Sequence, residues 1–261
     1  MKHKPKLGQN FLVDPAACMA IVRALGDVSQ QTVVEIGPGA GAITELLAPR
    51  AARLVAIELD RNLAPRLREQ FASTPSVEIL QADVLTVDFD QLRHGEKRLA
   101  VVGNLPYYIT SDILLRLFHF HEAISRAVIM VQREVADRIA AVPGTRDYGL
   151  LSATAQLYAG IERVLTLPPE AFMPPPDVHS TVLRLDMQPR FAELGVEAEP
   201  FIAFLKQSFA QKRKTLAKNL RAAGFASDLV TRALQSAEVA PASRAEELGW
   251  DAMARIWHAL R

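Results

Sequence analysis

The chain has 261 residues, of which 49% are hydrophobic and 23% charged, and its net charge is +1. This is the composition of a folded globular protein, and it excludes disordered, collagen-like and disulfide-stapled classes. Cys18 has no second cysteine to pair with, and no apolar run approaches the roughly 18–20 residues that span a bilayer, so we expect a cytoplasmic protein with no membrane partner.

The charges are unevenly distributed along the chain. Residues 201–261 carry ten basic and five acidic side chains, a net charge of +5, whereas residues 1–200 carry −4. Such an asymmetry indicates a polyanionic partner, although a solvated charged surface without a partner gives the same pattern.

Short β-branched runs alternate with helix-like stretches through the first two-thirds of the chain. Strands are predicted at 32–37, 53–59, 77–82, 99–104, 126–132 and 180–186, and helices at 41–50, 61–72, 111–121 and 133–141. This alternation favours a mostly parallel sheet with helices on both faces, so the predicted fold class is α/β.

A change of composition divides the chain. Prolines cluster at 167–178, where a helix cannot continue. From about Pro200 onward the apolar residues recur at helical spacing. We therefore predict a first domain over 1–189, with an N-terminal arm at 1–15, and a small all-helical domain over 190–261.

A glycine loop follows the first predicted strand of the sheet. Gly37, Gly39 and Gly41 stand in the sequence EIGPGAG, where the backbone can approach a ligand and the start of a helix offers free N–H groups. The spacing differs from the G-x-G-x-x-G of dinucleotide-binding proteins, which argues against a dehydrogenase. Taken alone, the loop is equally compatible with a tight β–α turn that binds nothing.

Two acidic residues end the next two strands. Glu58 follows Gly37 by 21 residues and can accept hydrogen bonds from both hydroxyls of a ribose. Asp83 can accept from the exocyclic amine of adenine, although each acid by itself could equally cap a strand. Together with the loop they predict a cofactor that contains adenosine and needs no pyrophosphate, and S-adenosylmethionine fits. This order of features, with Glu35 before the loop, resembles class I methyltransferases.

The sequence Asn104-Leu105-Pro106-Tyr107 follows the fourth strand. It resembles the motif of methyltransferases that act on an exocyclic amino nitrogen, here N6 of adenine. An aryl amine is a poor nucleophile, and the Asn104 side-chain oxygen with the Leu105 carbonyl can accept its hydrogens and localise its lone pair. Pro106 fixes the backbone, and Tyr107 offers a flat face on which an extruded base can stack.

A methyl sulfonium is already a strong electrophile, so positioning and electrostatics can carry this reaction without a metal. No set of cysteine, histidine and aspartate residues has metal-ligand spacing, and we expect no metal. The alternative is a proline-containing turn after a buried strand, with tyrosines that only pack in the core.

Five segments occur in the order typical of one family: LGQNFL, EIGPGAG, NLPYYITS, AFMPPPDVHSTVLRL and SFAQKRKTLAKNL. Over essentially its whole length the chain resembles KsgA-type small-subunit ribosomal RNA adenine dimethyltransferases, whose fold is a Rossmann-like sheet with a helical C-terminal domain. The resemblance implies cofactor contacts from Asn10, Leu12, Gly37, Glu58, Asp83 and Asn104, to which the glycine loop adds Gly39. It also implies that Phe172 lies near the target base together with Tyr107.

The substrate implied by the resemblance is a pair of adjacent adenosines in a hairpin loop near the 3′ end of small-subunit (16S) rRNA. Each is methylated twice at N6, which consumes four S-adenosylmethionine molecules, and the reaction belongs to small-subunit ribosome biogenesis. We expect the RNA to be presented in a ribosomal particle, no DNA partner, and a monomeric protein.

A basic segment near the C-terminus fits an RNA partner. Lysines and arginines recur along a predicted helix with an apolar side, at Lys212, Arg213, Lys214, Lys218 and Arg221. We expect phosphates to meet this basic face, with a solvated helix face as the alternative.

Other functions share parts of this pattern. An Erm-type large-subunit rRNA methyltransferase has the glycine loop and an Asn-x-Pro-Tyr motif, but FMPPPDVHS and QKRKTLAKNL favour the small-subunit family. A non-catalytic ribosome-assembly factor would keep the fold without the activity, and the intact sequence from Asn104 to Tyr107 argues against it. A DNA adenine methyltransferase is disfavoured because no target-recognition insertion is apparent.

Overall fold

The computed structural model describes residues 10–93, 95 and 97–261, so residues 1–9 of the predicted arm lie outside it. The chain forms two compact units. The first runs to Ala136 and resumes over Gly160–Met187, and the second comprises Asp137–Ala159 and Gln188–Arg261. In the described part of the chain, no helix combines the length and hydropathy needed to cross a bilayer.

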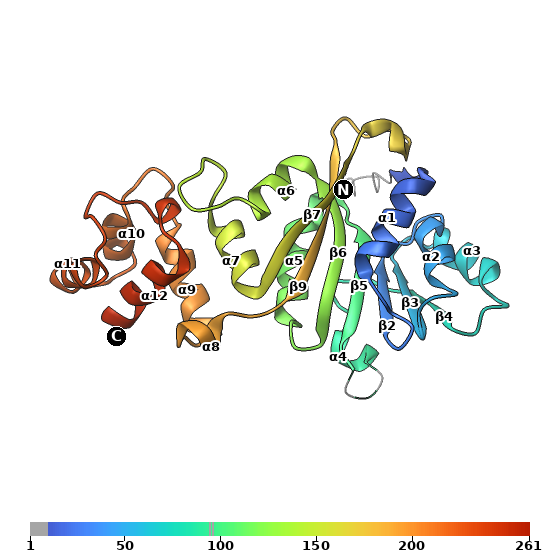
Figure 1. The fold of residues 1–261 in the computed structure, drawn as a ribbon, viewed down its shortest axis with the longest axis horizontal. Coiled ribbons are helices and arrows are strands. Elements are labelled where there is room, and N and C mark those ends of the chain that lie inside the picture. Colours follow the sequence, from blue (N-terminus) through green and yellow to red (C-terminus); the bar gives the residue numbers. More distant parts are fainter. Residues whose placement is uncertain (1–9, 94, 96) are drawn as a thin grey trace, which may run out of the picture. The chain divides into compact units, whose positions relative to one another are not determined.

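A seven-stranded sheet forms the centre of the first unit (Figure 1). Its strands are β2 (Thr32–Ile36), β3 (Arg53–Glu58), β4 (Val77–Gln81), β5 (Leu99–Asn104), β6 (Ile124–Gln132), β7 (Ala159–Leu167) and β9 (Ser180–Met187), in the order β4-β3-β2-β5-β6-β9-β7. The strands from β4 to β6 are parallel, and β9 runs antiparallel to β6. The predicted α/β class is confirmed, whereas β7 was not predicted because exposed polar residues interrupt its apolar pattern.

Helices cover both faces of this sheet. They are α1 (Pro15–Leu25), α2 (Ala42–Leu47), α3 (Leu63–Gln70), α4 (Phe89–Leu92) and α5 (Thr110–His119). Helix α6 (Arg133–Ile139) follows β6 and continues from the first unit into the second. Alternate residues of a strand point to opposite faces, so Val102 packs with α1 and α2 while Val101 faces the other side, where α5 lies (Figure 1). Helix α1 was not predicted, although Asp14 caps it by accepting from the backbone N–H groups of Ala16 and Ala17.

A small two-stranded ribbon joins two distant parts of the sequence. Strand β1 (Phe11–Leu12) pairs antiparallel with β8 (Phe172–Met173), with Phe11 opposite Met173 and Leu12 opposite Phe172. The buried Leu12 and Phe172 belong to the core shared with α1 and α2. The other face of the ribbon carries Phe11 and Met173, and Met173 is 62% exposed.

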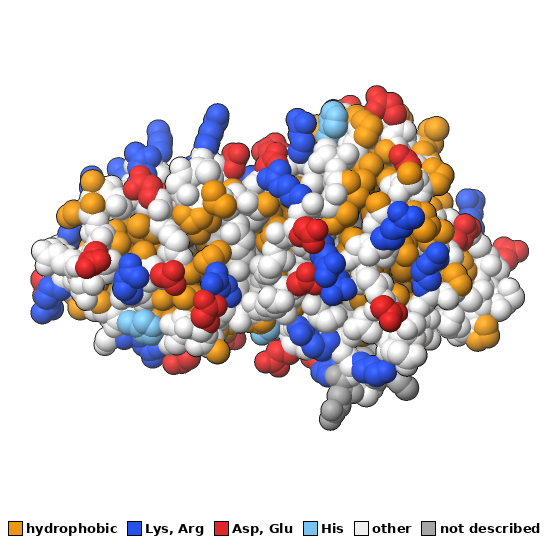
Figure 2. Space-filling model, in the orientation of Figure 1, with side chains coloured by type: hydrophobic (Ala, Val, Ile, Leu, Met, Phe, Trp, Pro, Cys, Tyr) orange, Lys and Arg blue, Asp and Glu red, His pale blue; other side chains and the backbone are white. Residues whose placement is uncertain are grey.

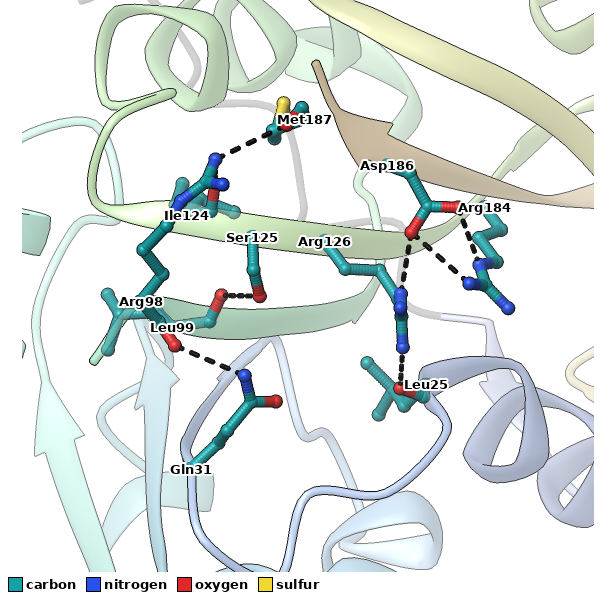
Figure 3. A network of polar contacts seen from close by, with 10 residues as sticks. All are labelled: Leu25, Gln31, Arg98, Leu99, Ile124, Ser125, Arg126, Arg184, Asp186 and Met187. Carbon is teal, nitrogen blue, oxygen red and sulfur yellow. Dashed lines mark hydrogen bonds and ion pairs between the residues drawn. The ribbon is translucent and has the colours of Figure 1, made fainter.

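A polar network lies at the end of the sheet where the parallel strands begin (Figure 3). Arg126 donates to Asp186 at 2.7 Å and also to the carbonyl of Leu25, the last residue of α1. Burial opposes charge on Asp186, but hydrogen bonds from Arg126 and Arg184 outweigh it and hold the pKa of this carboxyl below its usual value. Arg98 donates to the backbone carbonyls that precede β6 and end β9. The network thereby ties α1, β6 and β9 together, on the side of the sheet away from the loops that follow the parallel strands.

The second unit is helical. Its helices are α7 (Leu150–Tyr158), α8 (Phe191–Leu194), α9 (Ala198–Ser208), α10 (Leu216–Ala222), α11 (Ser227–Ser236) and α12 (Trp250–Ala259). Phe201 and Phe204 of α9 pack against Trp257 of α12, with ring centroids 6.2 and 5.3 Å from the tryptophan. These aromatic contacts, with the aliphatic residues around them, form a core separate from that of the sheet.

The predicted division at 189 and 190 differs from these units in the placement of residues 137–159. Leu157 is buried in the helical core, and Gln156 donates to the carbonyls of Ile139 and Ala141. The chain thus enters the helical unit, returns to the sheet through β7, and enters the helical unit again after Met187. A division by composition does not detect this excursion, because the chain leaves the sheet unit before the change of composition at about residue 190.

Candidate active site

A cavity lies at the carboxyl ends of β2, β3 and β5. The chain proceeds from β2 to β3 on one side and returns to β5 on the other, and such a reversal of strand order is where ligands bind in open α/β sheets. The lining includes the predicted residues Asn10, Leu12, Gly37, Gly39, Glu58, Asp83, Asn104, Leu105, Pro106 and Tyr107. The structure therefore brings together residues from widely separated positions of the sequence.

The glycine loop connects β2 to α2 along the cavity. Gly39 has a φ of 59°, in the left-handed region that favours glycine, and a Cβ at this position would lie 2.8 Å from the ring of Phe11. Phe11 of β1 therefore lies directly over the loop. No larger residue fits between the backbone at position 39 and this ring, so the loop can adopt this path only with glycine.

Glu58 holds the glycine loop from the end of β3. One carboxylate oxygen accepts from the backbone N–H of Gly39 at 3.2 Å, and the other accepts from that of Asp60 at 2.8 Å. Burial raises the pKa of Glu58 above its usual value, although these two hydrogen bonds oppose the rise. The carboxylate both fixes the loop and lines the cavity, where its remaining lone pairs can accept hydroxyl groups.

Glu35 at the end of β2 is a second buried carboxyl of the cavity, 2% exposed. Thr44 of α2 donates to it at 2.6 Å. Burial, and to a lesser extent the charge of Glu58, raise the pKa of Glu35 to about 7 against the opposing effect of the Thr44 hydrogen bond. The cavity therefore contains an acid that ionises close to neutral pH.

Asp83 follows β4 and is half-buried. Its Oδ1 accepts from the backbone N–H of Leu85 at 2.9 Å, in a local turn that fixes the side chain. The same carboxylate lines the cavity, where it can accept a hydrogen bond from an amine.

The segment from Asn104 to Tyr107 forms another wall of the cavity. The Asn104 Nδ2 donates to the carbonyl of Asn10 at 3.0 Å, so the Oδ1 of this amide is the atom that can accept from a ligand. The backbone N–H of Leu105 donates to the carbonyl of Met130 in β6 at 3.0 Å. Thr110 donates to the carbonyl of Pro106 at 3.1 Å and fixes the turn that leads into α5.

One residue of this wall, and one residue behind it, were not singled out from the sequence. Tyr108 lines the cavity beside Tyr107 and is 58% exposed. Ser180, the first residue of β9, is fully buried, and its Oγ lies 3.0 Å from the hydroxyl oxygen of Tyr107. The repeated tyrosine and the hydroxyl at the start of a predicted strand were visible in the sequence, but no spacing rule relates position 180 to position 107.

Phe172 differs from the other predicted residues in its location. It is 1% exposed, lies in the core together with Leu12 of β1, and is absent from the lining of the cavity. Its neighbour Met173 lies on the opposite face of the ribbon, beside Phe11. Contact between Phe172 and a base in the cavity would require β8 to rearrange.

The predicted basic residues lie in the helical unit, but the interpretation of them as one helix was wrong. Lys212, Arg213 and Lys214 lie in an exposed turn between α9 and α10, because Thr215 caps α10 by accepting from the N–H of Lys218 at 3.3 Å. Lys218 and Arg221 are exposed on α10 itself. We call residues 212–214 the basic turn. The Nζ of Lys212 donates a hydrogen bond to the backbone carbonyl of Arg146 at 3.0 Å. Figure 2 shows lysine and arginine side chains projecting from this unit.

The lining of the cavity fits S-adenosylmethionine. Glu58 and Asp83 supply oxygen acceptors for the hydroxyl and amine groups of an adenosine, and Gly39 leaves room for close approach to the backbone. No group of three or more histidine, cysteine, aspartate or glutamate residues is gathered to hold a metal among the described residues.

Comparison with known proteins identifies relatives over the whole chain. A model of the family described as ribosomal RNA adenine dimethylase matches residues 1–261. The ribosomal RNA small subunit methyltransferase A of Acidobacterium capsulatum is 62% identical over 259 residues, which cover 99% of this chain and 92% of the relative. The protein of the same name from Koribacter versatilis is 53% identical and covered to 94%, again with 99% of this chain matched.

Two solved structures resemble both units of the chain. The 23S rRNA methyltransferase ErmE has a TM-score of 0.74 at 27% identity, with 96% of this chain and 99% of that chain covered. A dimethyladenosine transferase from Plasmodium falciparum has a TM-score of 0.79 at 20% identity, with 94% and 95% covered, and it supports the fold.

Proposed function

The chain belongs to the ribosomal RNA adenine dimethylase family, and from this premise we propose how its cavity serves methyl transfer to small-subunit rRNA. The enzyme is an rRNA adenine dimethyltransferase, as the description of its family indicates, and its relatives are named small-subunit rRNA methyltransferases. The proposed substrate is a pair of adjacent adenosines in a hairpin loop near the 3′ end of 16S rRNA, each dimethylated at N6. The observation that carries the proposal is the wall from Asn104 to Tyr107, which faces the same cavity as the acids after β3 and β4.

S-Adenosylmethionine supplies an electrophilic methyl group when it is bound. Glu58 is placed to accept hydrogen bonds from the ribose hydroxyls, and Asp83 to accept from the adenine amine of the cofactor. Asn10, Leu12 and the loop of Gly37 and Gly39 enclose the remainder of the cofactor. The fixed positions of Glu58 and Asp83 support this assignment, because each carboxylate is already held by backbone N–H groups.

Asn104 and Leu105 act on the target amine. In the first transfer the Asn104 Oδ1 and the Leu105 carbonyl each accept one N6 hydrogen, which draws the nitrogen towards tetrahedral geometry and localises its lone pair for attack. The nitrogen then loses one of these protons, and in the second transfer its single remaining hydrogen is accepted by one of the two oxygens. Because Asn10 already holds the Nδ2 of Asn104, the amide presents its oxygen without an entropic cost at the moment of reaction. Tyr107 provides the face on which the extruded base stacks, and Pro106 fixes the turn between these groups.

RNA is bound by the helical unit as well as by the cavity. The basic turn and the exposed Lys218 and Arg221 supply positive charge for phosphates of a ribosomal particle. The protein acts as a monomer in this proposal.

Large-subunit rRNA is the competing substrate, because the chain also resembles ErmE in structure. We would incubate the protein with methyl-labelled S-adenosylmethionine and, separately, unmethylated small subunits, large subunits or DNA, and then identify the modified base. We expect N6,N6-dimethyladenosine from small subunits alone. Label in large subunits would support the Erm-type function, and tight binding of small subunits without label would support the assembly factor.

A further inference from the structure

The hydroxyl of Tyr107 is hydrogen-bonded to a residue outside the motif that contains it. Its partner, the Ser180 Oγ at 3.0 Å, is fully buried at the start of β9. Two backbone contacts fix that position: Ser180 pairs with Gln132 in the β6–β9 ladder, and the N–H of Arg133 donates to the carbonyl of His179 at 2.9 Å. Ser180 is therefore a rigid anchor, built on the sheet and not on a loop.

Tyr107 is thereby held at both ends. Its backbone lies in a 3-10 turn over Tyr107–Ile109, which Thr110 ties to Pro106. The other end of the side chain is bonded to Ser180, while the half-buried ring between them lines the cavity. A ring fixed at its backbone and at its hydroxyl has lost the rotational freedom about both side-chain torsions before any ligand arrives.

We propose that Ser180 is a positioning residue for methyl transfer, which orients the Tyr107 ring to receive the target base. The proposal rests on the proposed function, because it requires that a base stacks on Tyr107. Ser180 does not touch the substrate; it acts only through the tyrosine hydroxyl. Loss of the serine hydroxyl leaves the ring free to turn, so fewer encounters present the amine in line with the methyl group.

Removal of the bond from either side tests the proposal. Ser180→Ala and Tyr107→Phe each delete one hydroxyl, and the double variant deletes both. Thr181→Val is the matched control: Thr181 is the next residue of β9, is 1% exposed, and loses a hydroxyl contact of the same 3.0 Å length, to Thr166. Single-turnover methylation of small subunits, the apparent KM for small subunits and the Kd for S-adenosylmethionine are measured for all four variants.

The expected loss is about 5- to 10-fold in kcat/KM for each single variant, as is typical for loss of one hydrogen bond, with the Kd for S-adenosylmethionine within about twofold of wild type. The double variant should be no slower than either single variant, because both substitutions break the same contact. Thr181→Val should match wild type in kcat/KM.

Two outcomes would overturn the proposal. The first is that Ser180→Ala has the same kcat/KM as the control Thr181→Val. The second is that the losses of the two single variants add in the double variant, which would mean that Ser180 acts on the fold without Tyr107. Should Ser180→Ala fail to fold, Tyr107→Phe alone decides, and wild-type kcat/KM in that variant refutes the proposal. Failure of the proposed function is separate, because the wild-type protein would then methylate no adenine in small subunits.

Discussion

Polar side chains of the cavity are held in place by bonds that leave acceptor atoms available to a ligand. Asn104 is fixed through its Nδ2 and Asp83 through one carboxylate oxygen, while Glu58 accepts from two backbone N–H groups. Such bonds set the orientation of each group before binding, which reduces the entropy that binding must overcome. Many residues that line the cavity could be chosen from the sequence, although Phe172 does not line it. The internal bonds could not be predicted, because they depend on contacts such as that between positions 10 and 104.

Substitution of Glu58 is expected to act on cofactor affinity. Glu58→Ala removes an acceptor for the ribose and also releases the N–H of Gly39 in the loop, so the Kd for S-adenosylmethionine should rise about 10- to 100-fold. Isothermal titration calorimetry measures this directly. Glu69→Ala, on the exposed side of α3, is the control and should bind as wild type. If Glu58→Ala binds S-adenosylmethionine with the wild-type Kd, Glu58 does not contact the cofactor.

Glu35 predicts a specific pH dependence of stability. The folded-state pKa of about 7 lies above the usual value of 4.5, so the folded state favours the protonated carboxyl. The contribution to stability is therefore full below pH 4.5 and is lost as the pH rises through about 7. A rise of the pKa from 4.5 to about 7 corresponds to about 3 kcal/mol in total, as an order of magnitude.

Glu35→Gln removes this titration and keeps an oxygen that can accept from Thr44. Its free energy of unfolding relative to wild type should rise by roughly 2 kcal/mol between pH 5 and pH 8, measured by urea denaturation at each pH. A difference between the two proteins that stays constant over this range would show that Glu35 does not titrate near neutrality.

Among the secondary-structure elements, the pairing of β2 with β5 brings the site together. Gly103 of β5 lies so close to β2 that a Cβ there would be 2.7 Å from the carbonyl oxygen of Ile36. This approach sets the distance between the glycine loop after β2 and Asn104 at the end of β5. Any side chain at position 103 must push the two strands apart.

Gly103→Ala should therefore destabilise the protein by about 1–3 kcal/mol, the usual cost of overpacking, and should weaken S-adenosylmethionine binding as well. Urea denaturation and calorimetry give the two quantities. Gly160→Ala in β7 is the matched control, because its Cβ would have no neighbour within 4 Å, and it should be close to neutral. Equal stabilities of the two variants would show that the strands can separate without cost.

The elements were predictable to different degrees. The parallel strands stood out because β-branched runs buried on both faces read as continuous apolar sequence. Strands β1 and β8 have two residues each and exist only through their mutual pairing, for which a single sequence carries no signal. The basic turn was taken for helix because the apolar residues on either side of it, Phe209, Leu216 and Leu220, recur at helical spacing. The capping residue Thr215 was the missed sign that a new helix begins there.

For the molecule as a whole, catalysis and part of RNA binding are assigned to different compact units. The described residues that line the cavity belong to the first unit, and the basic turn belongs to the second. The uneven charge of the sequence predicts the same division, because the basic residues concentrate in the helical unit. The boundary did not follow from composition, because residues 137–159 leave the sheet unit and return to it.

Charge reversal of Lys212, Arg213 and Lys214 to glutamate should weaken binding to small subunits. It should also reduce the slope of the logarithm of the binding constant against the logarithm of the salt concentration by roughly 2 to 3, because each phosphate contact contributes somewhat less than one to this slope. Binding measured between 50 and 200 mM salt tests this. A variant with Arg232, Arg244 and Arg261 changed to glutamate has the same net charge in the same unit, all at exposed positions. The turn is not a phosphate contact if both variants have the same slope.

The central claim is that Asn104 activates the target amine and does not merely help to hold the cofactor. Its most direct test compares Asn104→Ala with wild type in single-turnover methylation of small subunits, alongside the Kd for S-adenosylmethionine. We predict at least a roughly 100-fold slower transfer, as for loss of a group that stabilises a transition state, with the Kd raised no more than about threefold. Transfer at near the wild-type rate, or a loss explained entirely by weaker cofactor binding, would contradict the account.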